Sequence, residues 1–295
     1  MLSKKTLYWP LMLFGMIVAA GQAWAAMHVP RAIYTDPPHD TQHPARMVVL
    51  HVPSGGVKVN GIAYLAEGAG RHPTVVLFVG LPGNEKNLDL AQAVRRAGWN
   101  AVAFFYRGSW GSPGIYRFSH NLEDARAVLA YLRATPRAHA LGIDTSHIVL
   151  LGHSMGGWVA AETAAHDQHI AGLVLISAAD MGDFGSTFPH AKLLKLMADN
   201  MESLSGVTPE QLADELQSHA SRWRFDRLYG QLAHVPLIVI TSDPLTAPAD
   251  NALVTALRTR GDREVTAIHM NTDHPYSDHR IALESAVINW LQTLP

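Results

Sequence analysis

The sequence contains no cysteine. Disulfide bridges and a lipid-modified cysteine are therefore excluded. A chain of 295 residues can bury ample apolar surface without such covalent constraints. The absence of cysteine also suits an oxidising compartment.

Neither sign of charge is in excess, because 23 Lys and Arg face 25 Asp and Glu, for a formal net charge of -2. Nucleic-acid-binding domains usually carry a strongly basic face. This balance gives no such footprint, so we expect no nucleic-acid partner. With 48% hydrophobic and 16% charged residues, the composition is that of an ordinary globular protein.

The first 26 residues differ from the rest. Lys4 and Lys5 precede an apolar stretch at residues 7–20, and an Ala-Trp-Ala triplet ends at Ala25. This arrangement is typical of a signal peptide cleaved after Ala25, so we expect an exported protein, periplasmic or secreted, without stable membrane association. The alternative is an uncleaved anchor, since residues 7–26 approach the roughly 20 apolar residues that span a bilayer.

The sequence thus divides into a signal peptide at residues 1–25, an extended lead-in at 26–45 and a single domain at 46–295. The lead-in contains several prolines and shows no apolar period. One large domain is the default for an α/β chain of this size.

From residue 46 onward, short apolar runs alternate with longer amphipathic stretches. The runs predict strands at residues 47–52, 57–65, 74–79, 100–106, 147–151, 170–177, 236–241 and 265–270. The stretches predict helices at residues 88–97, 122–133, 158–166, 250–260 and 281–291, with Asn121 and Asp250 as N-caps. Glycines at 55 and 56 predict a hairpin between the first two strands. Continuous apolar strands separated by helices predict an α/β fold, with a mostly parallel, doubly wound sheet of about eight strands.

The alternation stops at about residues 180–231, where we predict a small helical cap. Thr208 and Gln211 form a capping box that opens a helix there. Apolar side chains of this segment either line a substrate pocket or only pack the cap onto the domain: Phe184, Phe188, Leu194, Met197, Trp223, Phe225 and Tyr229.

A G-x-S-x-G motif at residues 152–156 follows a predicted apolar strand and precedes a predicted helix. A serine held in such a strained turn needs neighbours with almost no side chain, which Gly152 and Gly156 supply. We therefore predict that Ser154 is a nucleophile. The adjacent His153 is expected to pack or hydrogen-bond beside it rather than to act as the base.

With this motif the chain resembles the α/β-hydrolase superfamily, in the branch that holds dienelactone-hydrolase-like, serine-aminopeptidase-like and acyl-peptidase-like domains. The resemblance covers residues 46–294 and is carried further by GLPGNEK at 80–86, YRGSWGS at 106–112 and TDH at 272–274. It implies a serine hydrolase with a Ser-His-Asp triad and an acyl-enzyme intermediate. It places the loop at 106–112 on the rim of the site, tied down by Arg107.

The resemblance also implies an oxyanion hole made of the backbone N–H groups of Met155 and Leu81. Pro82 has no N–H and cannot serve. Related chains usually have histidine before the glycine of this loop, whereas Val79 precedes Gly80 here. The loop therefore lacks a side chain that commonly braces it.

The chain order in this fold is serine, acid, histidine. Asp243 follows the seventh predicted strand and is the expected acid, with Asp250 as the alternative. His274 lies between the last strand and the last helix and is the expected base. The runner-up is His279, while His269 falls within the strand.

Histidine is abundant, with 17 in the chain, but no pair has the spacing of a zinc motif such as H-E-x-x-H. We expect neither a metal nor a cofactor.

The resulting prediction is a serine hydrolase that cleaves a small-molecule ester, with a short-chain carboxylic ester as the leading candidate. An aminopeptidase or acyl-peptidase-like amide hydrolase would use the same residues. A non-catalytic binding protein on a hydrolase scaffold is the alternative from another class.

Overall fold

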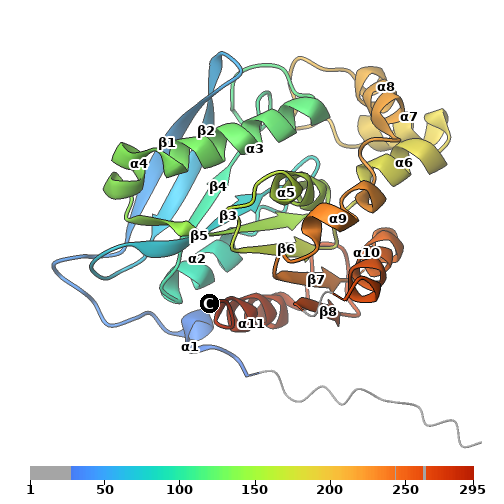
Figure 1. The fold of residues 1–295 in the computed structure, drawn as a ribbon. Helices are drawn as coiled ribbons and strands as arrows, with labels where there is room; N and C mark the ends of the chain where they lie inside the picture. The colour runs from blue at the N-terminus through green and yellow to red at the C-terminus, as the bar shows by residue number, and fades with distance from the viewer. Residues whose placement is uncertain (1–27, 243, 262–263) are drawn as a thin grey trace, which may run out of the picture.

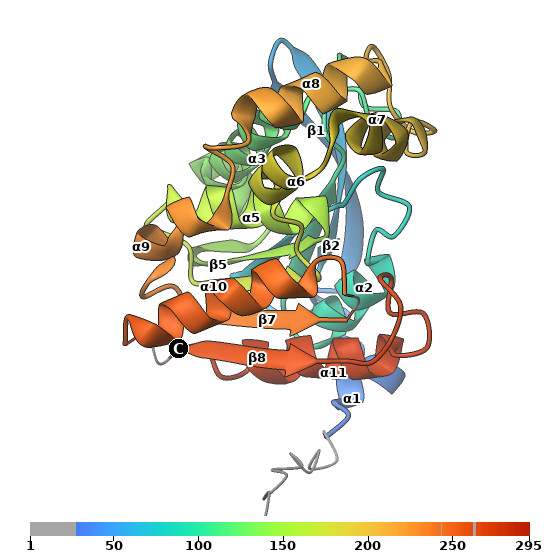
Figure 2. The ribbon, with the colours of Figure 1, turned by 90° about the vertical axis from the view of Figure 1, so that its right-hand side faces the viewer.

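The computed structural model describes residues 28–242, 244–261 and 264–295, so the predicted signal peptide lies outside the described residues. An eight-stranded sheet runs in the order β1-β2-β4-β3-β5-β6-β7-β8, with helices on both of its faces (Figure 1, Figure 2). β2 is antiparallel to β1 and β4, and all other neighbouring strands are parallel. The predicted α/β fold with a mostly parallel sheet is confirmed.

The strands are β1 (Arg46–Ser54), β2 (Val57–Leu65), β3 (His72–Phe78), β4 (Asn100–Phe104), β5 (Ile143–His153), β6 (Gly172–Ile176), β7 (Leu237–Thr241) and β8 (Val265–His269). The helices are α1 (Arg31–Tyr34), α2 (Leu88–Arg96), α3 (Phe118–Arg133), α4 (Thr135–Ala140), α5 (Met155–Ala165), α6 (Met181–Thr187), α7 (His190–Ala198), α8 (Pro209–His219), α9 (Tyr229–Leu232), α10 (Ala247–Thr259) and α11 (Arg280–Leu291).

The continuous apolar strands are explained by burial on both faces of the sheet. Val76 and Phe78 of β3 pack in a core with α3, α5 and the cap helices, whereas Val75 and Leu77 face a second core with α2 and α11. The sheet is therefore the middle layer of three.

The tight turn between β1 and β2 is the predicted hairpin. Gly55 and Gly56 have φ angles of 53° and 81°, a pair of left-handed conformations that a two-residue hairpin turn demands. Glycine at both positions removes the steric penalty.

Both predicted N-caps are wrong. α3 begins at Phe118, and Asn121 lies buried inside it, donating from Nδ2 to the Tyr116 hydroxyl at 3.0 Å. α10 begins after Thr246, and the buried Asp250 carboxylate instead accepts from the Ala178 N–H at 3.0 Å. In both cases the buried polar side chain bonds to a partner outside its helix instead of capping the helix end.

The segment between β6 and β7 contains α6, α7, α8 and α9. Thr208 and Gln211 form the predicted capping box at the start of α8. Figure 1 shows α6, α7 and α8 grouped beside the start of α3.

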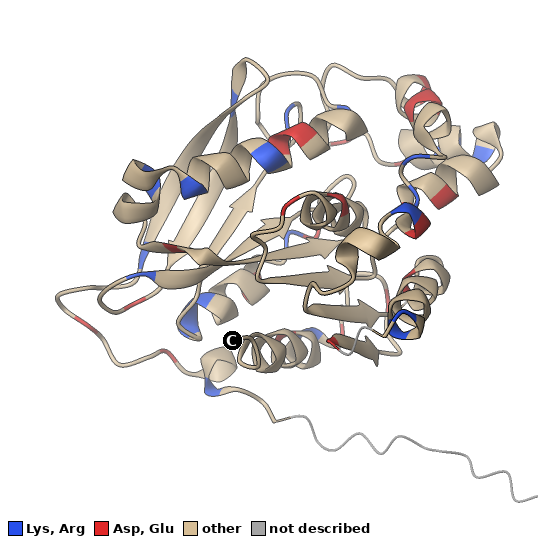
Figure 3. Ribbon diagram, in the orientation of Figure 1, with Lys and Arg blue, Asp and Glu red and all other residues tan. Residues whose placement is uncertain are grey.

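Basic and acidic residues are interspersed along the described ribbon (Figure 3). None of the described helices has the length and apolar character needed to cross a membrane.

Candidate active site

Ser154 stands between the end of β5 and the start of α5. Its φ and ψ angles are 57° and -127°. A non-glycine residue at such positive φ is strained, and strain of this kind concentrates at functional sites. The turn lifts the serine off the sheet edge at the N-terminus of α5.

The glycines around Ser154 are required by space. A Cβ on Gly152 would lie 2.2 Å from the Gly156 carbonyl oxygen, and a Cβ on Gly156 would lie 2.1 Å from the Phe78 carbonyl oxygen. A Cβ on Gly157 would lie 2.4 Å from the Ala178 Cβ. The expectation that this turn tolerates only minimal neighbours is confirmed.

A cavity of about 450 Å³ opens at Ser154, a size usual for small-molecule sites. It is lined by Leu81, Ser154, Met155, Ala179, Met181, Phe184, Leu196, Met197, Asn200, Pro244, Leu245, Thr246 and His274. Four of the five residues predicted for the site thus meet at one cavity. The fifth, Asp243, lies outside the described residues.

The three C-terminal histidines lie in different surroundings. His274 lines the Ser154 cavity. His269 Nδ1 lies 3.0 Å from the Thr241 hydroxyl, and His279 lines a different cavity, paired with Asp278 at 2.8 Å. Of the three, only His274 is on the described wall of the Ser154 cavity.

His153 touches the loop that carries His274. Its Nε2 lies 3.0 Å from the His274 carbonyl oxygen, which can only accept, so Nε2 carries the proton. The two rings also pack with their centroids 4.6 Å apart. The prediction that His153 packs or hydrogen-bonds beside the serine is confirmed, and its contacts fix the backbone of His274.

The loop at residues 79–83 runs directly beside the serine. A Cβ on Gly80 would lie 3.1 Å from the Ser154 Cβ and 3.6 Å from its Oγ. Leu81 follows on the cavity wall, and Met155 is the first residue of α5. The first N–H groups of a helix have no intrahelical acceptor, so the Met155 end of α5 is suited to hold an anion.

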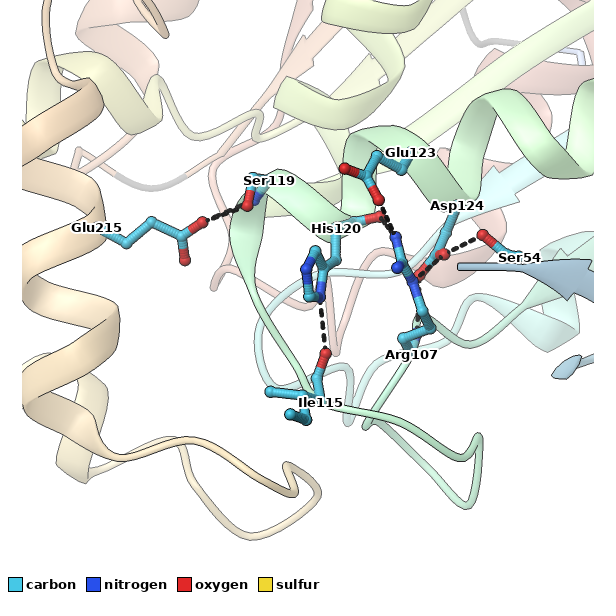
Figure 4. A network of polar contacts seen from close by, with 8 residues as sticks. All are labelled: Ser54, Arg107, Ile115, Ser119, His120, Glu123, Asp124 and Glu215. Atoms are coloured by element: carbon cyan, nitrogen blue, oxygen red, sulfur yellow. Dashed lines mark hydrogen bonds and ion pairs between the residues drawn. The ribbon is translucent and has the colours of Figure 1, made fainter. Parts of the chain in front are cut away.

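Arg107 ties down the rim loop as predicted (Figure 4). Its Nε donates to Asp124 Oδ1 at 2.6 Å, and its backbone N–H donates to Asp124 Oδ2 at 2.8 Å. Ser54 also donates to this carboxylate, at 2.5 Å. The side chain of Asp124 is fully buried, so the network fixes the loop to α3 and β1.

Of the cap side chains offered as pocket residues, Phe184 and Met197 line the cavity. Phe188 stacks on Phe184 at 4.9 Å, and Trp223 packs on Trp158 at 4.8 Å. The remaining cavity residues from this part of the chain were missed by sequence reasoning: Ala179, Met181, Leu196 and Asn200. Leu196 adjoins Met197 in α7, which is the one signal that could have found it.

The described cavity wall contains neither Lys, Arg, Asp nor Glu. Within the same described residues, no group of three His, Asp or Glu side chains is arranged to hold a metal ion.

Comparisons with known proteins agree with this architecture. Residues 72–229 match the family model described as serine aminopeptidase, S33. Over 169 residues the chain is 30% identical to the quorum-quenching protein AidA of Acinetobacter baumannii, and it spans about half the length of that curated relative, 53%.

Two solved structures show the same fold. An esterase from Pyrobaculum calidifontis superposes with a TM-score of 0.64 at 20% identity, covering 85% of this chain and 87% of the esterase. The acylaminoacyl peptidase of Pyrococcus horikoshii gives a TM-score of 0.62 at 16% identity, covering 84% of this chain and 41% of the peptidase.

Proposed function

Because the chain belongs to the serine aminopeptidase S33 family of the α/β-hydrolase superfamily, we propose that it hydrolyses a neutral carboxylic ester through Ser154, His274 and Asp243. The observation that carries the proposal is that Ser154 and His274, far apart in sequence, line one apolar cavity with Leu81 and Met155. Asp243 is included because it lies after β7 and before His274 in the sequence, where this fold places its acid.

In the first half-reaction, Ser154 Oγ attacks the ester carbonyl carbon while its proton passes to the His274 ring. The carbonyl oxygen becomes an oxyanion that accepts from the N–H groups of Leu81 and Met155. Collapse breaks the ester bond, and the leaving alcohol takes the proton from His274. The acyl group stays on Ser154.

In the second half-reaction, water gives a proton to His274 and attacks the acyl carbon. The tetrahedral intermediate expels Ser154 Oγ, which recovers that proton, and the carboxylic acid leaves. In both halves Asp243 accepts from the second ring nitrogen of His274, which fixes its tautomer.

The cavity wall supports a neutral acyl group. An aminopeptidase substrate brings a free α-ammonium group, and burying that charge without a carboxylate partner is unfavourable. The described wall of the cavity offers apolar side chains, Asn200 and Thr246, but no such carboxylate. A short-chain acyl ester meets no unpaired charge there.

The direct test compares wild type with Ser154→Ala on p-nitrophenyl esters graded by acyl length. We expect the variant to lose about 10⁴- to 10⁶-fold in turnover. Ser146→Ala is the matched control, because Ser146 is an exposed serine 3.0 Å from His147 Nδ1. A Ser154→Ala protein with near-native turnover would contradict the proposal.

Amide hydrolysis is the second candidate, since the matching family model is that of a serine aminopeptidase. Alanine p-nitroanilide and its N-acetyl derivative share a leaving group and differ in the charge of the substrate. Our account expects the N-acetyl compound to be the better substrate of the two. Two results together would establish the aminopeptidase instead: alanine p-nitroanilide cleaved faster than its N-acetyl derivative, and amides cleaved faster than esters.

A further inference from the structure

The carbonyl oxygen of Pro82 is held by two side chains from distant parts of the chain. Trp110 Nε1 donates to it at 2.7 Å, and Ser203 Oγ donates to it at 2.8 Å. Both distances are those of well-formed hydrogen bonds. Pro82 is buried and directly follows Leu81, the proposed oxyanion donor.

We propose that Trp110 and Ser203 are positioning residues that aim the Leu81 N–H at the oxyanion, an inference that rests on the proposed function above. The two donors fix the peptide between Pro82 and Gly83, and the ring of Pro82, whose φ is fixed, carries that restraint back to Leu81. The orientation of Leu81 is then set from outside the loop that contains it.

The indole of Trp110 is itself held at an energetic cost. Trp110 has a φ of 48°, a strained value for a bulky residue that persists only where the surroundings impose it. Its backbone N–H donates to the Ser203 carbonyl at 3.1 Å, and the Lys86 ammonium lies 3.3 Å from the centre of its ring. The surroundings therefore hold the indole N–H against the Pro82 carbonyl.

Gly83 is the position that permits this approach. Its φ is 90°, and a Cβ there would lie 3.0 Å from Trp110 Nε1 and 3.3 Å from the Gly80 carbonyl oxygen. A side chain at residue 83 would press on the indole nitrogen. Trp110 can therefore pack closely against Gly83 because residue 83 has no side chain.

Ser203 belongs to the segment that connects α7 to α8. Ser109 forms an isolated antiparallel bridge with Leu204, and the Ser205 N–H donates to the Gly108 carbonyl at 2.8 Å. Asn84 Nδ2 also donates to Glu202 at 2.7 Å. The segment between α7 and α8, the rim loop at 106–112 and the loop at 79–83 are therefore hydrogen-bonded to one another around Pro82.

The same loop is also held at residue 79. Val79 has no polar side-chain atom with which to brace the loop. Its carbonyl instead accepts from the Tyr106 hydroxyl at 3.3 Å. The loop is thus restrained through its backbone carbonyls, which accept from Tyr106, Trp110 and Ser203.

The test uses Trp110→Phe, which keeps a ring but removes the N–H, and Ser203→Ala, which removes the hydroxyl. With p-nitrophenyl butyrate we expect each variant to lower kcat about 10-fold with KM unchanged, since a displaced oxyanion donor weakens the transition state alone. The rate of labelling by a fluorophosphonate should fall by a similar factor. Ser203→Thr retains the hydroxyl and should restore most of the rate.

Two controls separate positioning from folding. Ser205→Ala removes a hydroxyl from the same segment whose acceptor is Gly114, 3.4 Å away, and Trp99→Phe changes an indole that packs in the other core. Both should keep kcat within about twofold. Trp110→Phe and Ser203→Ala should both remain fully folded at the assay temperature, and the pH dependence of their kcat/KM should be that of wild type.

Unchanged kcat and labelling in the Trp110→Phe, Ser203→Ala double variant would overturn the inference. So would a loss fully explained by a smaller folded fraction. Ser154→Ala in the same assays reports separately on the proposed function: if that variant stays active, the function fails, whereas an inactive Ser154→Ala beside a fully active double variant removes the positioning role alone.

Discussion

The strain at Ser154 is possible because its neighbours are almost without side chains. Ser154 has a φ of 57°, and the chain around it is closely packed: the Cβ position of Gly152 meets the backbone of Gly156, and that of Gly156 meets the end of β3 and the residue after it. Gly156 makes the tightest such contact, since its Cβ would lie 2.1 Å from one backbone oxygen and 2.6 Å from another, those of Phe78 and Val79. Backbone atoms at that distance cannot rotate away as a side chain can.

We therefore expect Gly156→Ala to lower the free energy of unfolding by about 2–3 kcal/mol, through overpacking against β3. Thermal or urea unfolding measures the change, and fluorophosphonate labelling of Ser154 should slow with it. Gly230→Ala in α9 is the control, because nothing lies within 4 Å of its Cβ position. Equal stability of the two variants would contradict this account of the turn.

Helices α3 and α8 are joined through one carboxylate. Glu215 of α8 accepts from the Ser119 backbone N–H at 2.9 Å and from the Ser119 hydroxyl at 2.7 Å (Figure 4). It also accepts from the Phe118 backbone N–H at 3.0 Å. The first N–H groups of α3 thus find their acceptor in the cap. This contact explains how α3 can begin without a capping hydrogen bond from the side chain of Arg117.

Removing that acceptor should loosen the cap. We expect Glu215→Ala to lower the free energy of unfolding by about 1–2 kcal/mol, as for other lost helix caps. Amide hydrogen exchange should rise at the start of α3 and in α8. Gln217→Ala, an exposed position on the same helix, should leave exchange unchanged, and an unchanged Glu215→Ala profile would rule out the joining role.

The packing of α11 against α2 contains a titrating carboxyl group. Burial, with the nearby charge of Asp89, raises the pKa of Glu284 to about 7, although Arg280 and Arg96 oppose the shift. The folded protein then holds this proton more tightly than the unfolded chain does. The stabilisation is complete below the ordinary glutamate pKa and is lost as pH rises through about 7.

Glu284→Gln should remove that dependence. At pH 8 we expect the variant to be more stable than wild type by about 1 kcal/mol, and at pH 4.5 to be nearly equal to it. Thermal midpoints at the two pH values give the comparison. Glu210→Gln, an exposed carboxylate of α8, is the control, and a Glu284→Gln protein with the wild-type pH dependence would contradict the assignment.

At the scale of the whole molecule, the period of apolar residues predicted the sheet because strands buried on both faces need continuous apolar runs. The G-x-S-x-G turn was predictable for a local reason, as its glycines are required within a few residues. Asn121 and Asp250 were misassigned because both side chains are buried and bond to distant residues, Asn121 to the Met155 sulfur and Asp250 to the Ala178 N–H, which no local pattern reveals.

The pocket was harder to predict for the same reason. Met181 and Asn200 reach the cavity from opposite ends of the α6–α7 segment, and their positions depend on how these helices pack. Trp110 and Ser203 both donate to the Pro82 carbonyl because the segment between α7 and α8 pairs with the rim loop at 106–112. The spacing of these residues in the sequence does not predict that they share an acceptor.

The account as a whole depends on a reactive hydroxyl at Ser154 that is activated by His274. The most direct measurement treats the folded protein with a fluorophosphonate and locates the adduct by mass spectrometry of its peptides. We predict one adduct, on Ser154, whose formation is lost in His274→Ala, and none on Ser146 despite the nearby His147 and Asp144. An adduct on Ser146, or equal labelling of Ser154 without His274, would contradict the account.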